Sequence, residues 1–437
     1  MAIRHSWTDI QSWITKSSSV LIKKLARNDC SWADGAENGH QNGMYIPREI
    51  REAGFFPPLR NTNPDKPHIF DARFETFWPG AGETKPSSLK HYSNKGTEMH
   101  FTRVPREEFS GLTPASWLLG GKTDIPIGEA RHWFMVIDSA SDEAELLESL
   151  FALDSNFHFD LFDPGKLLGK SPDENEQLIE ELASAARNGT LHQFIELASR
   201  MPTPGEFAKR AQDAWLVENR CTVIDPWTIE NPGDVIMRIS RDIEYALYKR
   251  AEVRFRAAQV LRILSTQANL VDAVIRGFTD LDAIFLSAAQ TRKNRAGLSF
   301  EHHVARVFRD GRIRYEEQVV LGRRRPDFVL PNVVTLRAAK RGSSAAMIVS
   351  LKTLLRERWK QVPLERFNSA IFLATVDDRV SAEAIADMAD NQIHLVVPES
   401  LKKSGETCYS GRSNVITFRD FFDEEIARKR PLFRQAM

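Results

Sequence analysis

Residues 325–331 read RPDFVLP and residues 347–365 read MIVSLKTLLRERWKQVPLE, and these two segments decide the fold of the second half of the chain. Each contains a short apolar run of the kind that predicts a strand. Asp327 opens the first run, and Lys352 ends the second. Two neighbouring strands that end together would place both side chains at one edge of a sheet.

Strand-like runs and helical patterns alternate through this half of the chain. Apolar residues recur at helical spacing in some stretches, and short β-type runs lie between or after them. The helical stretches include 243–264, 298–310 and 382–390, and the strand-like runs are 314–322, 328–330, 347–353, 370–376, 393–398 and 414–418. Such alternation is typical of an α/β domain, so we expect a mixed central sheet flanked by helices.

The first part of the chain, residues 1–168, is rich in Gly, Pro, Trp, Phe and His, and turn signals separate its short apolar runs. Residues 132–139 (HWFMVIDS) predict a strand, and residues 142–153 (DEAELLESLFAL) predict a helix. We therefore expect a mostly β domain with many loops. A polar stretch without apolar periodicity then places a linker at 169–178 and the second domain at 179–437.

Composition narrows the function classes. Acidic and basic residues balance at 59 each in a chain of 437 residues, whereas a protein that coats nucleic acid indiscriminately would be basic overall. The balance favours focused contacts by local basic clusters. The three cysteines show no CxxC spacing, so neither a zinc site nor a disulfide framework is indicated. No apolar run approaches the ~20 residues that cross a bilayer, so we expect a cytoplasmic protein without a membrane partner.

The candidate catalytic residues are acids grouped around a lysine. Nuclease patterns usually place an acid two residues before the lysine, but here Ser350 holds that position. Glu365 can supply the missing charge if its segment forms a helix that folds back over the sheet, and Glu301 is a further candidate. Asp327 and Glu365 would ligate Mg²⁺ through oxygen. Lys352 would orient or help to deprotonate the water that attacks a phosphodiester.

Each of these residues also has an ordinary structural interpretation. A Pro-Asp pair before a strand is a common turn, and a lysine that ends a strand is usually solvated. Glu365 in a charged helix is more often an ion-pair partner, and His302 and His303 are expected on a helix surface. The order and spacing of the acids and the lysine are more informative than any one residue.

Arg356, Glu357 and Arg358 follow the lysine closely. Arginine can donate in bidentate fashion to O6 and N7 of guanine, and glutamate can accept from the N4 amino group of cytosine. This chemistry suits a DNA site made of C·G pairs. The alternative is a solvent-facing helix surface laced with ion pairs, which composition alone favours.

At this point the chain resembles the EcoRII-type restriction endonucleases along nearly its whole length. The segments that carry the resemblance are NGHQNGMYIP, RKNRAGLSFEHH, RPDFVLP, SLKTLLRERWKQV with Glu365, and HLVVPESL. The resemblance implies a PD-(D/E)XK nuclease fold whose second acid has moved onto a helix. It also implies a catalytic core of Asp327, Lys352 and Glu365, with Glu301 beside them.

For the partners, the resemblance implies a Mg²⁺-dependent homodimer on double-stranded DNA, with residues 356–358 reading the CC and GG ends of the site. The N-terminal region resembles the family's effector domain, a β-pseudobarrel that binds a second copy of the site and shields the catalytic cleft until it does. His40, Tyr45 and Glu98 match DNA-contacting positions there. A companion methyltransferase on the same site is an expected partner.

The expected function is that of a sequence-specific type II restriction endonuclease of a CC(A/T)GG, CCNGG or CCGG-like site, autoinhibited by its N-terminal domain. One alternative is an endonuclease that depends on modified DNA. Another is a sequence-specific DNA-binding protein that no longer cleaves. The retained catalytic residues disfavour the last interpretation.

Overall fold

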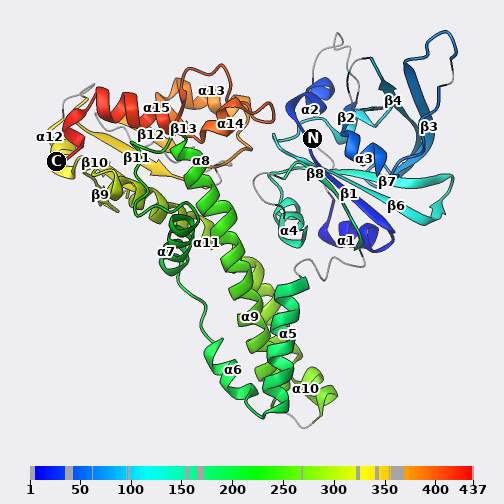
Figure 1. Cartoon of the computed structure of the whole chain (residues 1–437), viewed down its shortest axis with the longest axis horizontal. Coiled ribbons are helices and arrows are strands. Elements are labelled where there is room, and N and C mark those ends of the chain that lie inside the picture. The colour runs from blue at the N-terminus through cyan, green and yellow to red at the C-terminus, as the bar shows by residue number, and fades with distance from the viewer. Residues whose placement is uncertain are drawn as a thin grey trace. The chain divides into compact units, whose positions relative to one another are not determined.

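The computed structural model describes residues 5–34, 43–61, 63–94, 96, 99–151, 153, 157–164, 172–266, 269–320, 325–339, 344–353, 355 and 369–435. The chain divides into two compact units (Figure 1). Unit 1 comprises residues 1–170 together with 378–384 and 403–410, and unit 2 comprises 171–377, 385–402 and 411–437. Each unit is described by itself below.

Unit 1 is built on a sheet of eight strands in the order β2-β5-β4-β3-β7-β6-β1-β8. The strands are β1 (Ser19–Lys24), β2 (Met44–Ile46), β3 (Ile69–Trp78), β4 (Glu83–Tyr92), β5 (Met99–Thr102), β6 (Trp117–Ile127), β7 (Ala130–Ile137) and β8 (Phe159–Phe162). Its helices include α1 (Trp7–Thr15), α2 (Arg27–Asp34), α3 (Arg48–Glu52) and α4 (Asp142–Phe151). The expectation of a mostly β region is confirmed, and the predicted strand and helix are β7 and α4.

The sheet of unit 1 carries an apolar core on each face. Successive side chains of a strand point to opposite faces, and β1 shows this directly, because Leu21 joins one buried cluster while Val20 and Ile22 join the other. Close packing limits side-chain size between the strands. A Cβ atom on Gly121 would lie 2.2 Å from the indole nitrogen of Trp133, so a larger residue does not fit there.

Unit 2 contains a six-stranded sheet in the order β14-β13-β12-β11-β10-β9. The strands are β9 (Glu316–Glu317), β10 (Phe328–Leu330), β11 (Met347–Leu351), β12 (Ala370–Ala374), β13 (Ile393–Val397) and β14 (Val415–Thr417). Strands β11 to β14 are parallel, whereas β9, β10 and β11 pair antiparallel. The expected mixed sheet is therefore present. The run predicted at 314–322 is a strand only at β9 within the described residues.

Helices make up most of the rest of the second half (Figure 1). They are α5 (Pro172–Arg187), α6 (Leu191–Leu197), α7 (Pro204–Glu218), α8 (Pro232–Met237), α9 (Glu244–Leu264), α10 (Leu270–Arg276), α11 (Phe278–Asp310), α12 (Val333–Ala338), α13 (Ala382–Asp390), α14 (Glu399–Lys403) and α15 (Phe418–Asp420), with π-helical segments at Arg238–Ile243 and Phe421–Arg428. Across the described ranges, no helix is both long and apolar enough to cross a membrane.

The long helix α11 is held against the sheet by aromatic packing. Phe308 is fully buried, and its ring centroid lies 5.5 Å from that of Phe328 on β10 and 5.5 Å from that of Tyr315. Offset and edge-to-face aromatic pairs of this kind stabilise a core beyond the burial of their apolar area. The contact fixes the C-terminal end of α11 against β10, the strand that Asp327 precedes.

A buried polar network fixes the rotation of α11 against α7 and α9. The carboxylate of Glu244 accepts from Ser299 Oγ at 2.5 Å and contacts His303 Nε2 at 2.8 Å, and Gln212 Nε2 lies 3.1 Å from His303 Nδ1. His303 is 1% exposed, so its expected place on a helix surface was wrong. The reason is that α11 packs on α7 and α9, where Gln212 and Glu244 are buried partners of His303.

We expect the Glu244→Ala substitution to lower the free energy of unfolding by about 3–5 kcal/mol, because it leaves the imidazole and the hydroxyl of its two partners buried without an acceptor. Urea denaturation measures the change. The control is Lys209→Ala, which removes an exposed ion pair with Asp213 and should cost less than about 1 kcal/mol. Equal effects of the two substitutions would contradict the assignment.

Candidate active site

The start of β10 and the end of β11 meet at one edge of the sheet of unit 2. The two strands pair antiparallel, with Phe328 opposite Val349, so the residue before β10 lies beside the last residues of β11. Asp327 immediately precedes β10, and Lys352 immediately follows β11. The two side chains come together there as the sequence predicts.

Asp327 is held in place by the neighbouring strand. Its Oδ2 atom accepts the backbone N–H of Leu351 at 2.6 Å and lies 3.3 Å from Lys352 Nζ. The Lys352 ammonium also donates to the Leu351 carbonyl at 2.8 Å. Only 8% of Asp327 is exposed, whereas the lysine side chain is 33% exposed. The carboxylate is therefore fixed, and the ammonium remains accessible to a phosphate.

Glu301 brings a second carboxyl group to the same place from helix α11. Burial raises the pKa of Glu301 to about 7, and the negative charge of Asp327 reinforces the shift. Burial and a neighbouring negative charge both disfavour the ionised form of Glu301, and a bound cation would offset both effects. The fourth residue of the predicted set, Glu365, lies outside the described residues.

Gln318 also belongs to this group of side chains, although sequence analysis does not single it out. Its side-chain amide donates to Glu301 Oε2 at 2.5 Å. Its backbone φ is +54°, in the left-handed region that side-chain-bearing residues rarely adopt. Nothing in the run RYEEQVVLG signals this conformation, because tertiary contacts impose it.

The donor set fits a hard divalent cation in part. Asp327 and Glu301 provide carboxylate oxygens, the ligands that Mg²⁺ prefers, and Mg²⁺ usually keeps several waters beside one or two protein carboxylates. Within the described ranges no group of three His, Cys, Asp or Glu residues could hold a metal. Ser350, which takes the place of the usual acid on β11, is buried and uncharged.

Most of the predicted DNA-contacting residues fall outside the described part of the chain. These are Arg356, Glu357, Arg358, His40 and Glu98. Tyr45 is described: it lies on β2, is 40% exposed and stacks on His100 of β5 with the ring centroids 5.0 Å apart. Burial lowers the pKa of His100, so this ring is neutral at pH 7.

Comparison with known proteins identifies relatives for both halves of the chain. The family described as EcoRII C terminal matches residues 261–422. The type II restriction enzyme EcoRII of Escherichia coli is 24% identical over 418 residues, which cover 92% of this chain and 93% of that enzyme. The type II restriction enzyme SsoII of Shigella sonnei is 31% identical over 224 residues, which cover 46% of this chain and 71% of that enzyme.

Among solved structures, metal-depleted Ecl18kI in complex with uncleaved DNA is similar, with a TM-score of 0.45 and 23% sequence identity. The match covers 56% of this chain and 87% of that chain.

We expect the Glu301→Gln substitution to change how stability depends on pH. The pKa of this carboxyl group is near 4.5 in the unfolded chain and about 7 in the folded protein. The folded protein binds the proton more tightly, so the wild type loses stability as the pH rises from 4.5 to about 7. In the absence of metal, the change in the free energy of unfolding caused by Glu301→Gln should therefore be more favourable at pH 8 than at pH 5. The difference should be on the order of 1 kcal/mol after allowing for solvent screening.

Urea denaturation in EDTA at the two pH values measures this difference. The matched control is Glu383→Gln on the exposed surface of α13, which should leave the pH profile of the wild type unchanged. If Glu301→Gln and the wild type show parallel profiles, the raised pKa is refuted.

Proposed function

Because the chain belongs to the EcoRII-type restriction endonucleases, which are site-specific deoxyribonucleases, we propose that it cleaves double-stranded DNA at a CC…GG-type site by Mg²⁺-dependent hydrolysis. The site is CC(A/T)GG, CCNGG or CCGG-like. The observation that carries the proposal is the convergence of Asp327, Lys352 and Glu301 at one sheet edge. We place this activity in the cytoplasm.

In the proposed reaction, water attacks the phosphorus and the bond to the 3′ oxygen breaks, which leaves a 5′-phosphate and a 3′-hydroxyl. Asp327 and Glu365, with Glu301 beside them, would hold Mg²⁺, which supplies Lewis acidity and lowers the pKa of a bound water. Lys352 lies 3.3 Å from Asp327, where its ammonium can orient the attacking water and offset the charge that develops on the phosphate.

The proposed recognition of the site assigns its outer C·G pairs to residues 356–358. Bidentate Arg contacts with guanine and a Glu contact with the cytosine amino group account for CC and GG ends. The described residue just before this segment is firmly anchored. The N–H of Leu355 donates to the buried Asp377 carboxylate at 2.7 Å, which ties Leu355 to the residues that follow β12.

We propose that the N-terminal region is an effector domain of the pseudobarrel type, which binds a second copy of the site through His40, Tyr45 and Glu98 and restrains cleavage until it does. Support comes from the make-up of unit 1, which includes residues 378–384 and 403–410. These segments come from the half of the chain that carries the proposed catalytic residues. The chain therefore passes between unit 1 and unit 2 several times, which gives unit 1 covalent connections through which it could affect unit 2.

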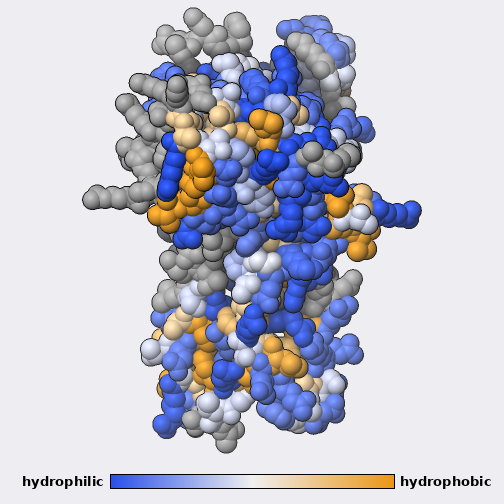
Figure 2. Space-filling view, turned by 90° about the vertical axis from the view of Figure 1, so that its left-hand side faces the viewer, coloured by the Kyte–Doolittle hydropathy of each residue, from blue (hydrophilic) through white to orange (hydrophobic). Residues whose placement is uncertain are grey.

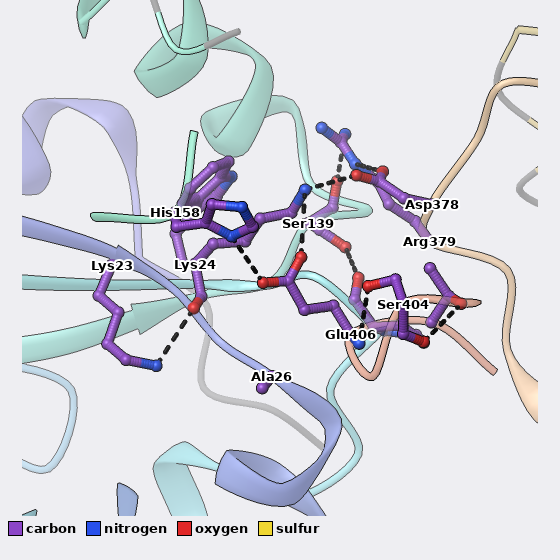
Figure 3. Close-up of polar contacts among 12 residues, drawn as sticks. Lys23, Lys24, Ala26, Ser139, His158, Asp378, Arg379, Ser404 and Glu406 are labelled. Atoms are coloured by element: carbon purple, nitrogen blue, oxygen red, sulfur yellow. Dashed lines mark hydrogen bonds and ion pairs between the residues drawn. The ribbon is translucent and has the colours of Figure 1, made fainter. Parts of the chain in front are cut away.

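Buried ion pairs hold these segments in unit 1 (Figure 3). Lys24 Nζ contacts the Asp378 carboxylate at 2.6 Å, and both side chains are almost fully buried. Arg379 pairs with Glu148 of α4 and donates to the carbonyl of Ser139 at 2.8 Å. Separating the partners of a buried ion pair costs several kcal/mol. These contacts can therefore restrain the residues that lead into α13.

A homodimer is the proposed assembly, with one active site for each DNA strand and a methyltransferase that protects the same site in the host. Figure 2 shows one face of the molecule, on which hydrophobic residues are scattered among hydrophilic ones. The exposed large apolar residues on α10 and the start of α11 are Leu270, Val271, Val274, Ile275 and Phe278. An exposed apolar patch of this kind suits contact with a second copy.

We expect Lys352→Ala to reduce cleavage at least about 10²- to 10³-fold, because it removes charge stabilisation at the phosphate, while DNA binding is retained. The measurement incubates the full chain with unmethylated plasmid and Mg²⁺, adds an oligonucleotide that carries a second site, and sequences the fragment ends. Wild type should give discrete ends sharing CC…GG, and EDTA should abolish them.

The control for this experiment is Lys403→Ala, an exposed lysine on α14, which should cleave like the wild type. Loss of DNA binding by a folded Lys352→Ala protein would contradict the catalytic role. Cleavage of methylated plasmid alone would instead establish the modification-dependent alternative.

We expect the double substitution Arg379→Met with Glu148→Gln to raise cleavage of single-site DNA by roughly 5- to 150-fold, the usual range of allosteric coupling. Replacing both partners avoids leaving one buried charge unpaired. Cleavage without the second-site oligonucleotide is measured. The control is Arg48→Met with Glu52→Gln, which removes an exposed pair of the same type in unit 1. Unchanged single-site cleavage would refute the restraint.

A further inference from the structure

Gln318 bridges the two acidic positions of the proposed active site. Its backbone N–H donates to the carbonyl of Asp327 at 3.0 Å, and its side-chain amide donates to Glu301 at 2.5 Å. The Nε atom of Arg325 donates to the Gln318 carbonyl at 3.2 Å. One residue therefore touches the strand that carries the first carboxylate and the side chain that carries the second.

The backbone conformation of Gln318 points to a specific purpose for this bridge. Its φ of +54° is costly for a residue with a Cβ atom, and among such residues Asn and Asp adopt it more readily than Gln. Asparagine is one methylene shorter. The longer amide spans the gap to Glu301 while the backbone still extends the β9–β10 ladder to Asp327. Strained backbone of this kind persists where the surrounding structure holds it in place.

An amide is chemically suited to hold this carboxyl group. It donates a hydrogen bond without adding a charge, so it restrains Glu301 without neutralising it as a lysine would. The negative charge of Asp327 disfavours the ionised form of Glu301, whereas the hydrogen bond from Gln318 favours it. The hydrogen bond from Gln318 keeps the carboxyl oxygen atoms of Glu301 close to Asp327.

We propose that Gln318 is a positioning residue for DNA cleavage, which fixes Glu301 beside Asp327 so that both carboxylates face one divalent cation. The inference rests on the proposed function and deepens it, because it adds a residue that acts through Glu301. Partners of metal-ligating side chains typically change metal affinity or activity by 10–100-fold when they are removed.

The test compares Gln318→Met, which keeps length but removes the donor, with Gln392→Met. Gln392 also has positive φ, +58°, and is exposed in a turn after α13, so it reproduces the backbone effect without the acid. Gln318→Met should weaken Mn²⁺ binding, followed by electron paramagnetic resonance of the metal, about 10-fold or more. Single-turnover cleavage should fall 10–100-fold, and DNA binding in EDTA should not change.

Gln318→Asn keeps the amide and suits the left-handed backbone, but it is too short to reach Glu301, so we expect the same losses in a stably folded protein. In a Glu301→Ala background, Gln318→Met should add no further loss, as expected when one residue acts through the other. Wild-type-like Mn²⁺ affinity and cleavage in either Gln318 variant would overturn the inference.

The outcomes separate this inference from the proposed function. If the wild type cleaves and the Gln318 variants match Gln392→Met, the inference fails and the function stands. If the wild type leaves unmodified and methylated two-site DNA intact in Mg²⁺, the proposed function fails, and the Mn²⁺ titration still decides whether Gln318 positions a metal ligand.

Discussion

The catalytic half depends on the hydrogen bond from the backbone of Leu351 to the carboxylate of Asp327. This bond couples the antiparallel pairing of two strands to the position of one charged oxygen. It places the negative charge beside Lys352, where Glu301 of α11 brings a second carboxyl group. A buried carboxylate that accepts a backbone N–H cannot move without breaking the end of a strand. The strand pairing thus fixes the geometry of the candidate site.

The sequence predicts those parts of the structure that local patterns determine. Apolar runs bounded by turn residues predict β10 to β14, and their ends place Asp327 and Lys352 correctly. The pattern does not reveal which polar residues become buried when a helix is covered on several sides. His303 illustrates this, since its helix is surrounded by α7, α9 and the sheet. The backbone conformation of Gln318 is likewise set by partners distant in sequence.

Two kinds of constraint meet in unit 2. The sheet edge is rigid because apolar strands and aromatic contacts fix it. The polar network around Glu244 fixes the rotation of α11, which matters because a helix turned by one residue would carry Glu301 about 100° away from the sheet edge. Rigid support of this kind holds Glu301 close to Asp327, although the charge of Asp327 disfavours the ionised form of Glu301. The stability of unit 2 and the geometry of its candidate site are therefore set by the same contacts.

The interleaved make-up of unit 1 affects the order in which the protein can assemble during synthesis. Lys24 is translated early, but its buried partner Asp378 lies 354 residues later in the chain. The N-terminal unit, although made first, is completed only after most of the polypeptide has left the ribosome. Domains usually fold in the order of their synthesis. Here Lys24 stays without its buried partner until Asp378 has been translated, so unit 1 cannot form all of its buried contacts before then.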